Sequence, residues 1–336
     1  MERVLLGMSG GVDSSVAAYL LQKDGYEVVG ITMSLINKEN DTSIEDARKV
    51  CEKLGIEHHV LDLKNEFKNE IINKFIDSYL NAKTPNPCID CNKFFKFGYL
   101  WNKAKELNCK YIATGHYASI KDNNIYKIDS PKDQTYFLSK INKEVIPHIL
   151  FPLSNYYNKE ETRQIAEDQG LVTHNKKDSQ DICFIENDYS DILEQNITNL
   201  PPKGNFILKD GTVLGEHKGI IYYTIGQRKG LGISYKCPLY VIEINKDANE
   251  VILGKEDELY TNEVYINNIN ILVDKLPNKA QGKIRYKARP TNCTIEIIDE
   301  NNYKIVFEEP VKSATPGQTL ALYDNDLLLG GGTIKK

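Results

Sequence analysis

Short apolar runs alternate with amphipathic stretches from the start of the chain to about residue 197. Runs of consecutive apolar residues are typical of strands buried on both faces, whereas apolar residues repeated every three or four positions are typical of helices. A capping signature at Thr42-Ser43, followed by Glu45 and Asp46, adds a helix that stops at Gly55. The pattern predicts strands over Arg3–Met8, Glu27–Met33, His59–Leu63 and Tyr111–Thr114, and helices over Val16–Lys23 and Glu66–Asn81.

This alternation predicts an α/β domain with a doubly wound parallel sheet, whose ligands bind at the carboxyl ends of the strands. After Pro201-Pro202 the pattern changes to short alternating runs separated by turn residues, which favours β structure. We therefore expect an α/β domain over 1–197, a small β-rich domain over 198–261 and a β-barrel over 262–336. Further strands are predicted at Asn205–Leu208, Lys218–Tyr223, Leu239–Ile244, Ile266–Leu272, Gly282–Ala288, Thr294–Ile298, Lys304–Phe307, Thr319–Tyr323 and Leu327–Gly330.

Composition and charge narrow the class of protein. The chain has 336 residues, of which 41% are hydrophobic and 26% are charged, as in ordinary globular proteins. No apolar stretch is long enough to cross a bilayer and the first residues do not read as a secretory leader, so we expect a cytoplasmic protein without membrane contact. The net charge of -5 argues against indiscriminate nucleic-acid binding, but it is compatible with a local basic surface.

A glycine-rich segment joins the first predicted strand to the first helix and reads Gly7-Met8-Ser9-Gly10-Gly11-Val12-Asp13-Ser14-Ser15. Its glycines let the backbone present N–H groups to an anion, its serines add hydroxyl donors, and Asp13 is suited to Mg²⁺. It lacks the lysine of a Walker A loop and the GxGxxG spacing of dinucleotide folds, and a tight turn without a ligand is the alternative. The segment resembles the pyrophosphate loop of the N-type ATP pyrophosphatases, which implies cleavage of ATP between its α and β phosphates.

Seven cysteines are scattered along the chain, and in a reducing compartment they are expected as thiols. Cys88 and Cys91 form a CxxC pair after a proline-stiffened turn, and Cys183 ends a polar run. The pair leaves a zinc site, a redox pair and a catalytic thiol open, although no second CxxC supplies the remaining zinc ligands. A helix start and the lysines at 93 and 96 are expected to lower the pKa of Cys91. Small buried side chains are expected at Cys51, Cys109, Cys237 and Cys293.

Six motifs carry a resemblance that covers the whole chain. They are Ser-Gly-Gly-Val-Asp-Ser (9–14), Thr-Pro-Asn-Pro-Cys-Ile-Asp-Cys-Asn (84–92), Ala-Thr-Gly-His-Tyr-Ala (113–118), Lys-Asp-Gln-Thr-Tyr-Phe-Leu (132–138), Ser-Gln-Asp-Ile-Cys-Phe (179–184) and Tyr-Thr-Ile-Gly-Gln-Arg-Lys-Gly-Leu-Gly (223–232). In order and spacing they resemble the bacterial tRNA-specific 2-thiouridylases. The resemblance implies an enzyme that adenylates the C2 oxygen of the wobble uridine in glutamate, glutamine and lysine tRNAs with ATP. Sulfur then replaces that oxygen, and AMP and pyrophosphate are released.

The resemblance also implies roles for individual residues. Cys91 would be the nucleophile and Cys183 would carry the incoming sulfur as a persulfide, with a transient disulfide between them that a reductant resets. ATP would be held by Gly7, Met8, Ser9, Gly10, Gly11, Val12, Asp13, Ser14, Met33 and Gly115. The target base, once out of its stack, would be cradled by Asn86, Pro87 and Cys88. Contacts to tRNA would come from His116, Lys132, Asp133, Gln134, Arg285, Tyr286 and Gln318.

Several alternatives stay open. Cys88, Cys91 and Cys183 together have the thiols to ligate an iron–sulfur cluster, but a persulfide relay fed by a cysteine desulfurase or a sulfur-relay protein is favoured. Another adenylating synthetase of the same loop family would need neither Cys91 nor Cys183, and a tRNA-binding module without catalysis would not need Asp13. For His116 the alternative is a core histidine whose hydrogen bonds are made within the protein. The basic run around Arg285 is either a phosphate-contacting surface or a solvated strand face.

Overall fold

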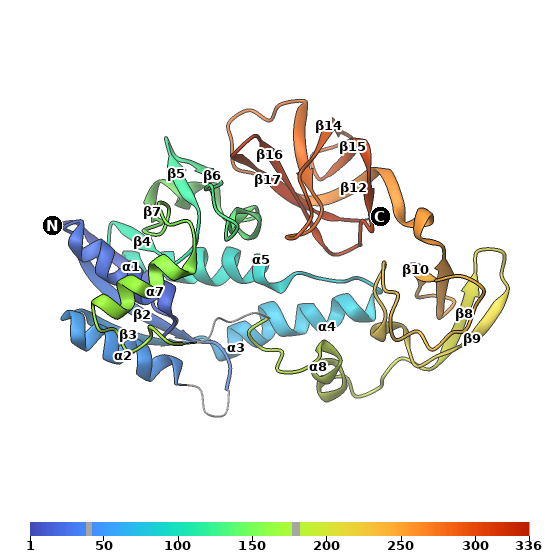
Figure 1. Cartoon of the computed structure of the whole chain (residues 1–336), viewed down its shortest axis with the longest axis horizontal. Helices are drawn as coiled ribbons and strands as arrows, with labels where there is room; N and C mark the ends of the chain where they lie inside the picture. Colours follow the sequence, from blue (N-terminus) through green and yellow to red (C-terminus); the bar gives the residue numbers. More distant parts are fainter. Residues whose placement is uncertain (38–41, 177–181, 336) are drawn as a thin grey trace.

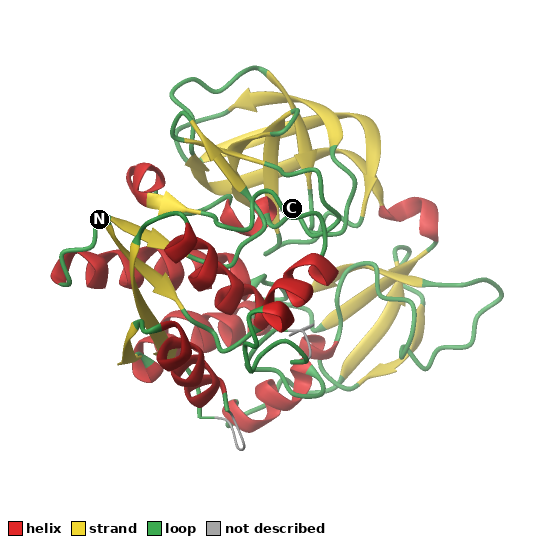
Figure 2. Ribbon diagram, turned by 60° about the vertical axis from the view of Figure 1, so that its left-hand side comes forward, coloured by secondary structure: helices red, strands yellow, loops and turns green. Residues whose placement is uncertain are grey.

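The computed structural model describes residues 1–37, 42–176 and 182–335 and contains three bodies of secondary structure (Figure 1). A parallel sheet with helices on both faces forms the first body, a small sheet forms the second, and a closed β-barrel forms the third (Figure 2). The predicted fold class is confirmed. No helix in the described part of the chain is long and apolar enough to cross a membrane.

The first sheet has five parallel strands in the order β3-β2-β1-β4-β7. Val4 and Leu6 point toward the helices on one face, whereas Leu5 points toward the other, which explains why β1 is apolar throughout. Because the strands are parallel, their carboxyl ends meet along one edge. The strands are β1 (Arg3–Gly7), β2 (Glu27–Ser34), β3 (Glu57–Asp62), β4 (Tyr111–Ala113) and β7 (Ile149–Leu150), so all four strands predicted here are present with small shifts at their ends.

Helices cover both faces of this sheet. On one face an apolar layer that includes Val16, Ala47 and Ala166 joins three helices to the strands. On the other face Phe97, Leu100 and Val145 do the same. The elements on the first face are α1 (Val12–Lys23), α2 (Ser43–Leu54) and α7 (Lys159–Asp168), and those on the other face are η2 (Asn92–Tyr99), α6 (Leu100–Glu106), η3 (Thr135–Leu138) and η4 (Lys143–His148). The first helix thus begins at Val12, directly after the glycine loop and earlier than predicted.

Two long helical runs extend from the first body toward the second (Figure 1). The first run consists of α3 (Lys64–Phe67), η1 (Lys68–Ile72) and α4 (Asn73–Leu80), and it matches the long helix predicted over Glu66–Asn81. The second run consists of α5 (Pro87–Cys91), η2 (Asn92–Tyr99) and α6 (Leu100–Glu106). The segments η1 and η2 are π-helical, a wide-turn geometry that is frequent at functional sites.

The second body is a sheet with the strand order β10-β11-β8-β9. An apolar cluster shared by Phe75 of α4 and Val251 of β11 packs this sheet against the long helices. The prediction of a strand over Lys218–Tyr223 is wrong, because Gly219 adopts a φ of 134° and approaches the carbonyl of Pro201 so closely that the chain turns there. The elements are α8 (Tyr189–Asn196), β8 (Gly204–Leu208), β9 (Val213–His217), η5 (Ile220–Tyr222), β10 (Tyr240–Asn245) and β11 (Glu250–Gly254).

The third body is the predicted barrel, which closes through the pairing of β12 with β17. The strand predicted over Gly282–Ala288 ends at Lys283, because the chain then turns outward and the ring of Tyr286 packs on Phe137 of the first body, 4.5 Å between centroids. The elements are η6 (Glu256–Leu259), β12 (Tyr260–Ile271), β13 (Lys279–Lys283), β14 (Thr291–Ile297), β15 (Asn302–Lys312), β16 (Thr319–Asp324) and β17 (Leu327–Ile334).

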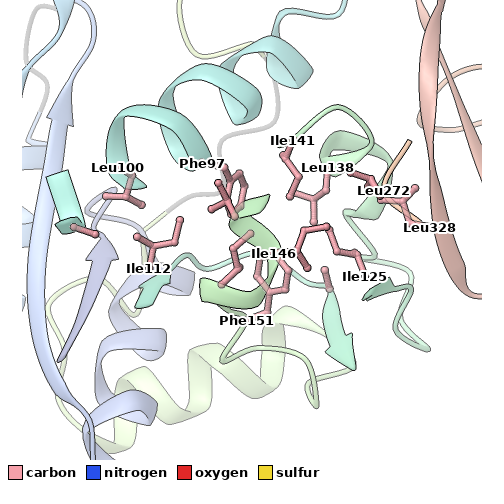
Figure 3. Close-up of a cluster of buried hydrophobic side chains, with 14 of the residues drawn as sticks. Phe97, Leu100, Ile112, Ile125, Leu138, Ile141, Ile146, Phe151, Leu272 and Leu328 are labelled. Carbon is pink, nitrogen blue, oxygen red and sulfur yellow. The ribbon is translucent and has the colours of Figure 1, made fainter. Parts of the chain in front are cut away.

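The first body and the barrel share one hydrophobic core. The hairpin of β5 (Ser119–Lys121) and β6 (Asn124–Tyr126) extends the barrel sheet at β17, although it lies within the first predicted domain. Figure 3 shows Leu272 and Leu328 of the barrel beside Ile125 and Leu138 of the first body. Burying these side chains together stabilises the position of the barrel relative to the parallel sheet.

Candidate active site

The glycine-rich loop lies at the carboxyl end of β1 and leads directly into α1. Its three serines hold it closed: the Ser9 backbone N–H donates to Ser14 Oγ at 3.2 Å, and the Oγ atoms of Ser14 and Ser15 donate to the Gly11 carbonyl at 3.1 Å and 2.8 Å. Gly10 has a φ of 66°, and a Cβ there would lie 2.3 Å from the Ser43 carbonyl oxygen. Only glycine fits this position, so the loop is seated tightly on the N-terminus of α2.

The predicted nucleotide residues converge on the edge where the parallel strands end. Gly7 pairs with Ile31 of β2, two residues before Met33, and Leu6 pairs with Ala113 of β4, two residues before Gly115. A Cβ on Gly115 would lie 2.9 Å from the Asp13 carbonyl carbon and 3.0 Å from the Ser14 amide nitrogen. Gly115, the second residue after β4, therefore touches the loop itself. The structure brings together the loop over residues 7–14 and Gly115, and it places Met33 on the adjacent strand end.

Asp13 lies in the first turn of α1 and has two partners that the sequence did not reveal. The Tyr117 hydroxyl donates to Asp13 Oδ1 at 3.1 Å, and Lys159 Nζ lies 3.0 Å from Asp13 Oδ2. Lys159 is the first residue of α7, and Tyr117 follows β4. Both contacts depend on how distant elements pack, and no local pattern marks either residue.

Cys88 and Cys91 lie in the first turns of the second long helical run. Asn86 is the N-cap residue, and its side-chain oxygen accepts a hydrogen bond from the Cys88 backbone N–H at 3.2 Å. Pro87 occupies the first helical position, where its fixed φ suits the helix and its missing N–H leaves no donor unpaired. The predicted base-binding residues 86–88 thus form one rigid cap directly before Cys91.

The expectation of a lowered pKa at Cys91 is wrong. Burial among apolar side chains raises the pKa of its thiol to about 12, and the Lys96 ammonium opposes this effect without outweighing it. Lys93 does not help, because its ammonium lies over the ring of Phe94, 5.2 Å from the centroid. Cys91 is therefore a protonated thiol at neutral pH and needs a nearby cation or substrate to ionise.

Cys183 lies close enough to Cys91 for its charge to contribute to the raised Cys91 pKa. The two segments share an apolar cluster that contains Cys91, Ile182 and Phe184. Phe184 is 6% exposed, and its ring centroid lies 5.9 Å from that of Phe67 and 5.3 Å from that of Phe75. These rings anchor the chain directly after Cys183, whose own side chain is exposed. The polar run over 178–181 lies outside the described residues.

The predicted tRNA-contacting residues of the first body differ in exposure. Lys132 is exposed, whereas Asp133 accepts a hydrogen bond from Thr135 Oγ1 at 2.7 Å and Gln134 accepts one from the Tyr117 N–H at 3.0 Å. His116 is 7% exposed, with Nδ1 2.7 Å from Thr114 Oγ1. Burial, with the nearby Lys96 ammonium, holds the pKa of His116 well below its usual range. This environment matches the core-histidine alternative, and a tRNA contact by His116 stays a prediction.

The predicted residues of the barrel lie in two places. Arg285 is exposed on the turn after β13, next to Tyr286, whose ring packs on Phe137. Gln318 instead reaches the first body, where its Nε2 donates to the Thr84 carbonyl at 2.8 Å. The Thr84 N–H donates to the Pro316 carbonyl at 2.8 Å, so the barrel holds the backbone that leads into the base-binding cap.

Known protein families match three consecutive segments that together span nearly the whole chain. Residues 2–187 match the family described as tRNA methyl transferase HUP domain, residues 190–255 the tRNA methyl transferase PRC-barrel domain, and residues 261–334 the aminomethyltransferase beta-barrel domain. The chain is 44% identical to tRNA-specific 2-thiouridylase MnmA of Clostridioides difficile, over all of this chain and 98% of that one. It is 45% identical to a tRNA-specific 2-thiouridylase MnmA 2 of Clostridium botulinum, over 99% of this chain and 98% of that one. The chain belongs to the tRNA-specific 2-thiouridylase family.

Two metal groups are of interest at this site: Mg²⁺, which would arrive with ATP, and an iron–sulfur cluster. Asp13 offers carboxylate oxygens beside the loop, which is the donor chemistry that Mg²⁺ prefers. Across residues 1–37, 42–176 and 182–335, no group of three histidine, cysteine or acidic side chains is arranged to hold a metal ion. The iron–sulfur alternative, which involves Cys88, Cys91 and Cys183, is a question for direct iron analysis.

Proposed function

We propose that this protein is an ATP-dependent tRNA-uridine 2-sulfurtransferase that thiolates the wobble uridine of glutamate, glutamine and lysine tRNAs in the cytoplasm. The observation that carries the proposal is the proximity of two thiols in a thiouridylase-family chain: Cys91 lies in one apolar cluster with Ile182 and Phe184, the two neighbours of Cys183, and the charge of Cys183 contributes to the raised pKa of Cys91. Methyl transfer, which the domain descriptions name, and amidation by a synthetase both lack a use for this pair. Sulfur transfer requires it.

The glycine loop supports the first half of the reaction, in which ATP activates the uridine. Backbone N–H groups at the start of α1, together with Ser9 and Ser14, face the region where a pyrophosphate would lie. Mg²⁺ bound with ATP near Asp13 would neutralise phosphate charge. The C2 oxygen of uridine attacks the α phosphate, a new P–O bond forms, and pyrophosphate leaves. The oxygen at C2 thereby becomes part of a good leaving group, AMP.

The cap formed by Asn86, Pro87 and Cys88 supports binding of the target base beside the nucleophile. An enzyme that acts on a base must first take it out of its stack, and a rigid cap provides a fixed surface for the extruded ring. Gln318 of the barrel donates to the carbonyl of Thr84, two residues before the cap. A tRNA bound on the barrel would therefore have a fixed position relative to the cap. Arg285 and Lys132 are exposed cations suited to tRNA phosphates.

The thiol pair supports the second half of the reaction. A cysteine desulfurase or a relay protein would leave Cys183 as a persulfide. The Cys91 thiolate attacks the inner sulfur, a Cys91–Cys183 disulfide forms, and hydrosulfide is released beside the adenylated base. Hydrosulfide then forms the C2–S bond while the C2–O bond to AMP breaks. A dithiol reductant reduces the disulfide and returns both thiols.

Lys96 explains how Cys91 reaches its reactive form despite its raised pKa. Lys96 lies one π-turn after Cys91 in η2 and is the strongest influence that lowers the thiol pKa. When the Cys91 proton leaves, the Lys96 ammonium stabilises the thiolate that attacks the persulfide.

The experiment incubates purified protein with unmodified glutamate tRNA, ATP, Mg²⁺ and a persulfide-loaded desulfurase, and digests the tRNA for mass spectrometry. We expect 2-thiouridine with wild type and none with Cys91→Ala or Cys183→Ala. Cys237→Ala, which changes a thiol outside the proposed pair, is the matched control and should retain activity. Absence of thiouridine with every sulfur source would overturn the function. Iron in the anaerobically purified protein, at one cluster per active chain, would replace the relay by a cluster mechanism.

A further inference from the structure

Asn92, the residue directly after Cys91, has a buried side-chain oxygen that makes no hydrogen bond. Asn92 is 2% exposed, and its amide nitrogen Nδ2 donates to the Phe137 carbonyl at 3.2 Å. Its Oδ1 is buried as well, but no residue over 1–37, 42–176 or 182–335 donates a hydrogen bond to it. A buried acceptor without a donor destabilises a protein, and few are found in native structures. Its presence beside the nucleophile indicates a partner that arrives with the substrate.

Asn92 lies on the helix face that carries the base-binding cap. Its backbone N–H donates to the Cys88 carbonyl, so it sits one helical turn after Cys88 and on the same side. Side chains on a helix lean toward its N-terminus, which directs Asn92 toward the cap over residues 86–88. The helix η3 closes the other side, because the Phe137 carbonyl holds Asn92 and the Tyr136 hydroxyl lies beside the Asn86 side chain. The acceptor is therefore next to the surface proposed for the target base.

The Phe137 carbonyl fixes the orientation of the Asn92 amide. A carbonyl oxygen only accepts hydrogen bonds, so the atom that faces it is the NH₂ group and Oδ1 faces the opposite way. Rotating the amide by half a turn would bring two acceptors together and leave both without a donor. The group that Asn92 offers to a ligand is therefore an acceptor, and its complement is an N–H donor.

Uracil and cytosine present opposite groups to such an acceptor. Next to its C2 carbonyl, uracil carries N3–H, which donates, whereas the N3 atom of cytosine has no hydrogen and accepts. Enzymes that flip a base commonly read it by hydrogen bonds to this edge of the ring. Because Oδ1 is shielded from solvent, cytosine would place two acceptors against each other with no water between them. The site thus favours uracil.

We propose that Asn92 selects uridine at the wobble position, with its Oδ1 accepting a hydrogen bond from N3–H of the flipped base. The ring reaches Oδ1 by settling on the cap and pushing aside the half-buried Cys88 side chain. No proton is transferred and no covalent bond changes in this recognition step. The inference deepens the proposed function and rests on its wobble-uridine substrate.

The first test measures binding to the full-length protein and needs no turnover. Anticodon stem-loops of glutamate tRNA carry uridine, cytidine or 3-methyluridine at the wobble position. We expect wild type to bind the uridine form about 10- to 100-fold more tightly than either of the others, which lack the N3–H donor. Equal affinity for uridine and 3-methyluridine in wild type would overturn the inference without the need for a variant.

The matched variants assign the preference to Asn92. Asn92→Leu has a similar size and no acceptor, so the uridine and cytidine forms should bind within about threefold of each other. Asn270→Ala removes another side-chain amide that donates to backbone carbonyls, those of Ser139 at 3.1 Å and Ile141 at 3.0 Å, directly after η3. It should keep the wild-type preference. A preference that persists in Asn92→Leu would overturn the inference.

The second test follows thiolation of uridine-34 and cytidine-34 tRNAs in competition, with ATP, Mg²⁺ and the persulfide-loaded desulfurase. Mass spectrometry of the digested tRNA gives the ratio of 2-thiouridine to 2-thiocytidine, which reports the ratio of the two kcat/KM values. In Asn92→Leu we expect this ratio to fall about 10- to 100-fold relative to wild type. An equal loss of activity on both tRNAs would mean that Asn92 only supports the helix around Cys91, and would overturn the inference.

The two tests also separate the inference from the proposed function. If wild type forms no thiolated base but binds the uridine stem-loop with a preference that Asn92→Leu loses, the proposed function is wrong and the inference stands. If wild type thiolates tRNA but binds uridine and cytidine stem-loops equally, the inference is wrong and the proposed function stands.

Discussion

Replacing Phe184 by alanine removes the ring that anchors the chain directly after Cys183. The ring is 6% exposed and makes edge-to-face contacts with Phe67 and Phe75 in the cluster that includes Cys91. A buried Phe→Ala change costs about 3–5 kcal/mol. We treat opening of this segment as a local event and take the lower value, about 3 kcal/mol, for the loss in the free energy of its attachment. The equilibrium ratio of attached to detached segment then falls by roughly 100-fold.

The assay for Phe184→Ala follows formation of the Cys91–Cys183 disulfide after addition of a thiol oxidant, using peptide mass spectrometry. We expect the rate to fall by at least tenfold, since the two thiols meet only while the segment is attached. Phe307→Ala removes an equally large ring from the barrel core, where Phe307 is 2% exposed, and should lose stability in urea without slowing the disulfide. An unchanged disulfide rate in Phe184→Ala would refute the reasoning that this cluster brings the thiols together.

Three further predictions concern the edges of the site. Gly115→Ala should weaken ATP binding about tenfold or more in calorimetry, because its Cβ would lie 2.9 Å from backbone of Asp13; retained affinity would show that the loop shifts freely. Gln318→Ala should raise the KM for tRNA with little change in ATP affinity, because the donor to the Thr84 carbonyl is lost; an equal change in both would contradict a local role. Alkylation of Cys91 by iodoacetamide should increase about tenfold per pH unit from pH 7 to about pH 10, because burial raises its pKa to about 12, and a plateau near pH 8 would contradict this assignment.

Much of the α/β body was predictable because its signals are local. The consecutive apolar residues of β1 and β2 fit only strands covered on both faces, and Gly55 ends α2 in the left-handed conformation that glycine favours. The residues over Lys218–Tyr223 show a similar apolar pattern and yet form η5. What decides there is the close approach of Gly219 to Pro201, a contact between distant residues that no local pattern encodes.

The site also combines features that the local sequence predicts with features that depend on contacts between distant elements. The loop conformation around Gly10 and the cap at Asn86 follow from residue types that are recognisable in the sequence. Lys159 was missed because its contact with Asp13 depends on the packing of α7 against α1. The error in the pKa of Cys91 has the same origin: the neighbouring lysines are visible in the sequence, but the apolar side chains that bury the thiol come from other elements.

The central claim is that Cys91 releases sulfur from a Cys183 persulfide onto ATP-activated uridine. It is tested most directly in a single turnover, with Cys183 loaded with isotopically labelled persulfide sulfur and reductant omitted. We predict that labelled 2-thiouridine and a Cys91–Cys183 disulfide appear together, in equal amounts and only when ATP is present. Labelled 2-thiouridine formed while both cysteines remain reduced, or formed without ATP, would contradict the account.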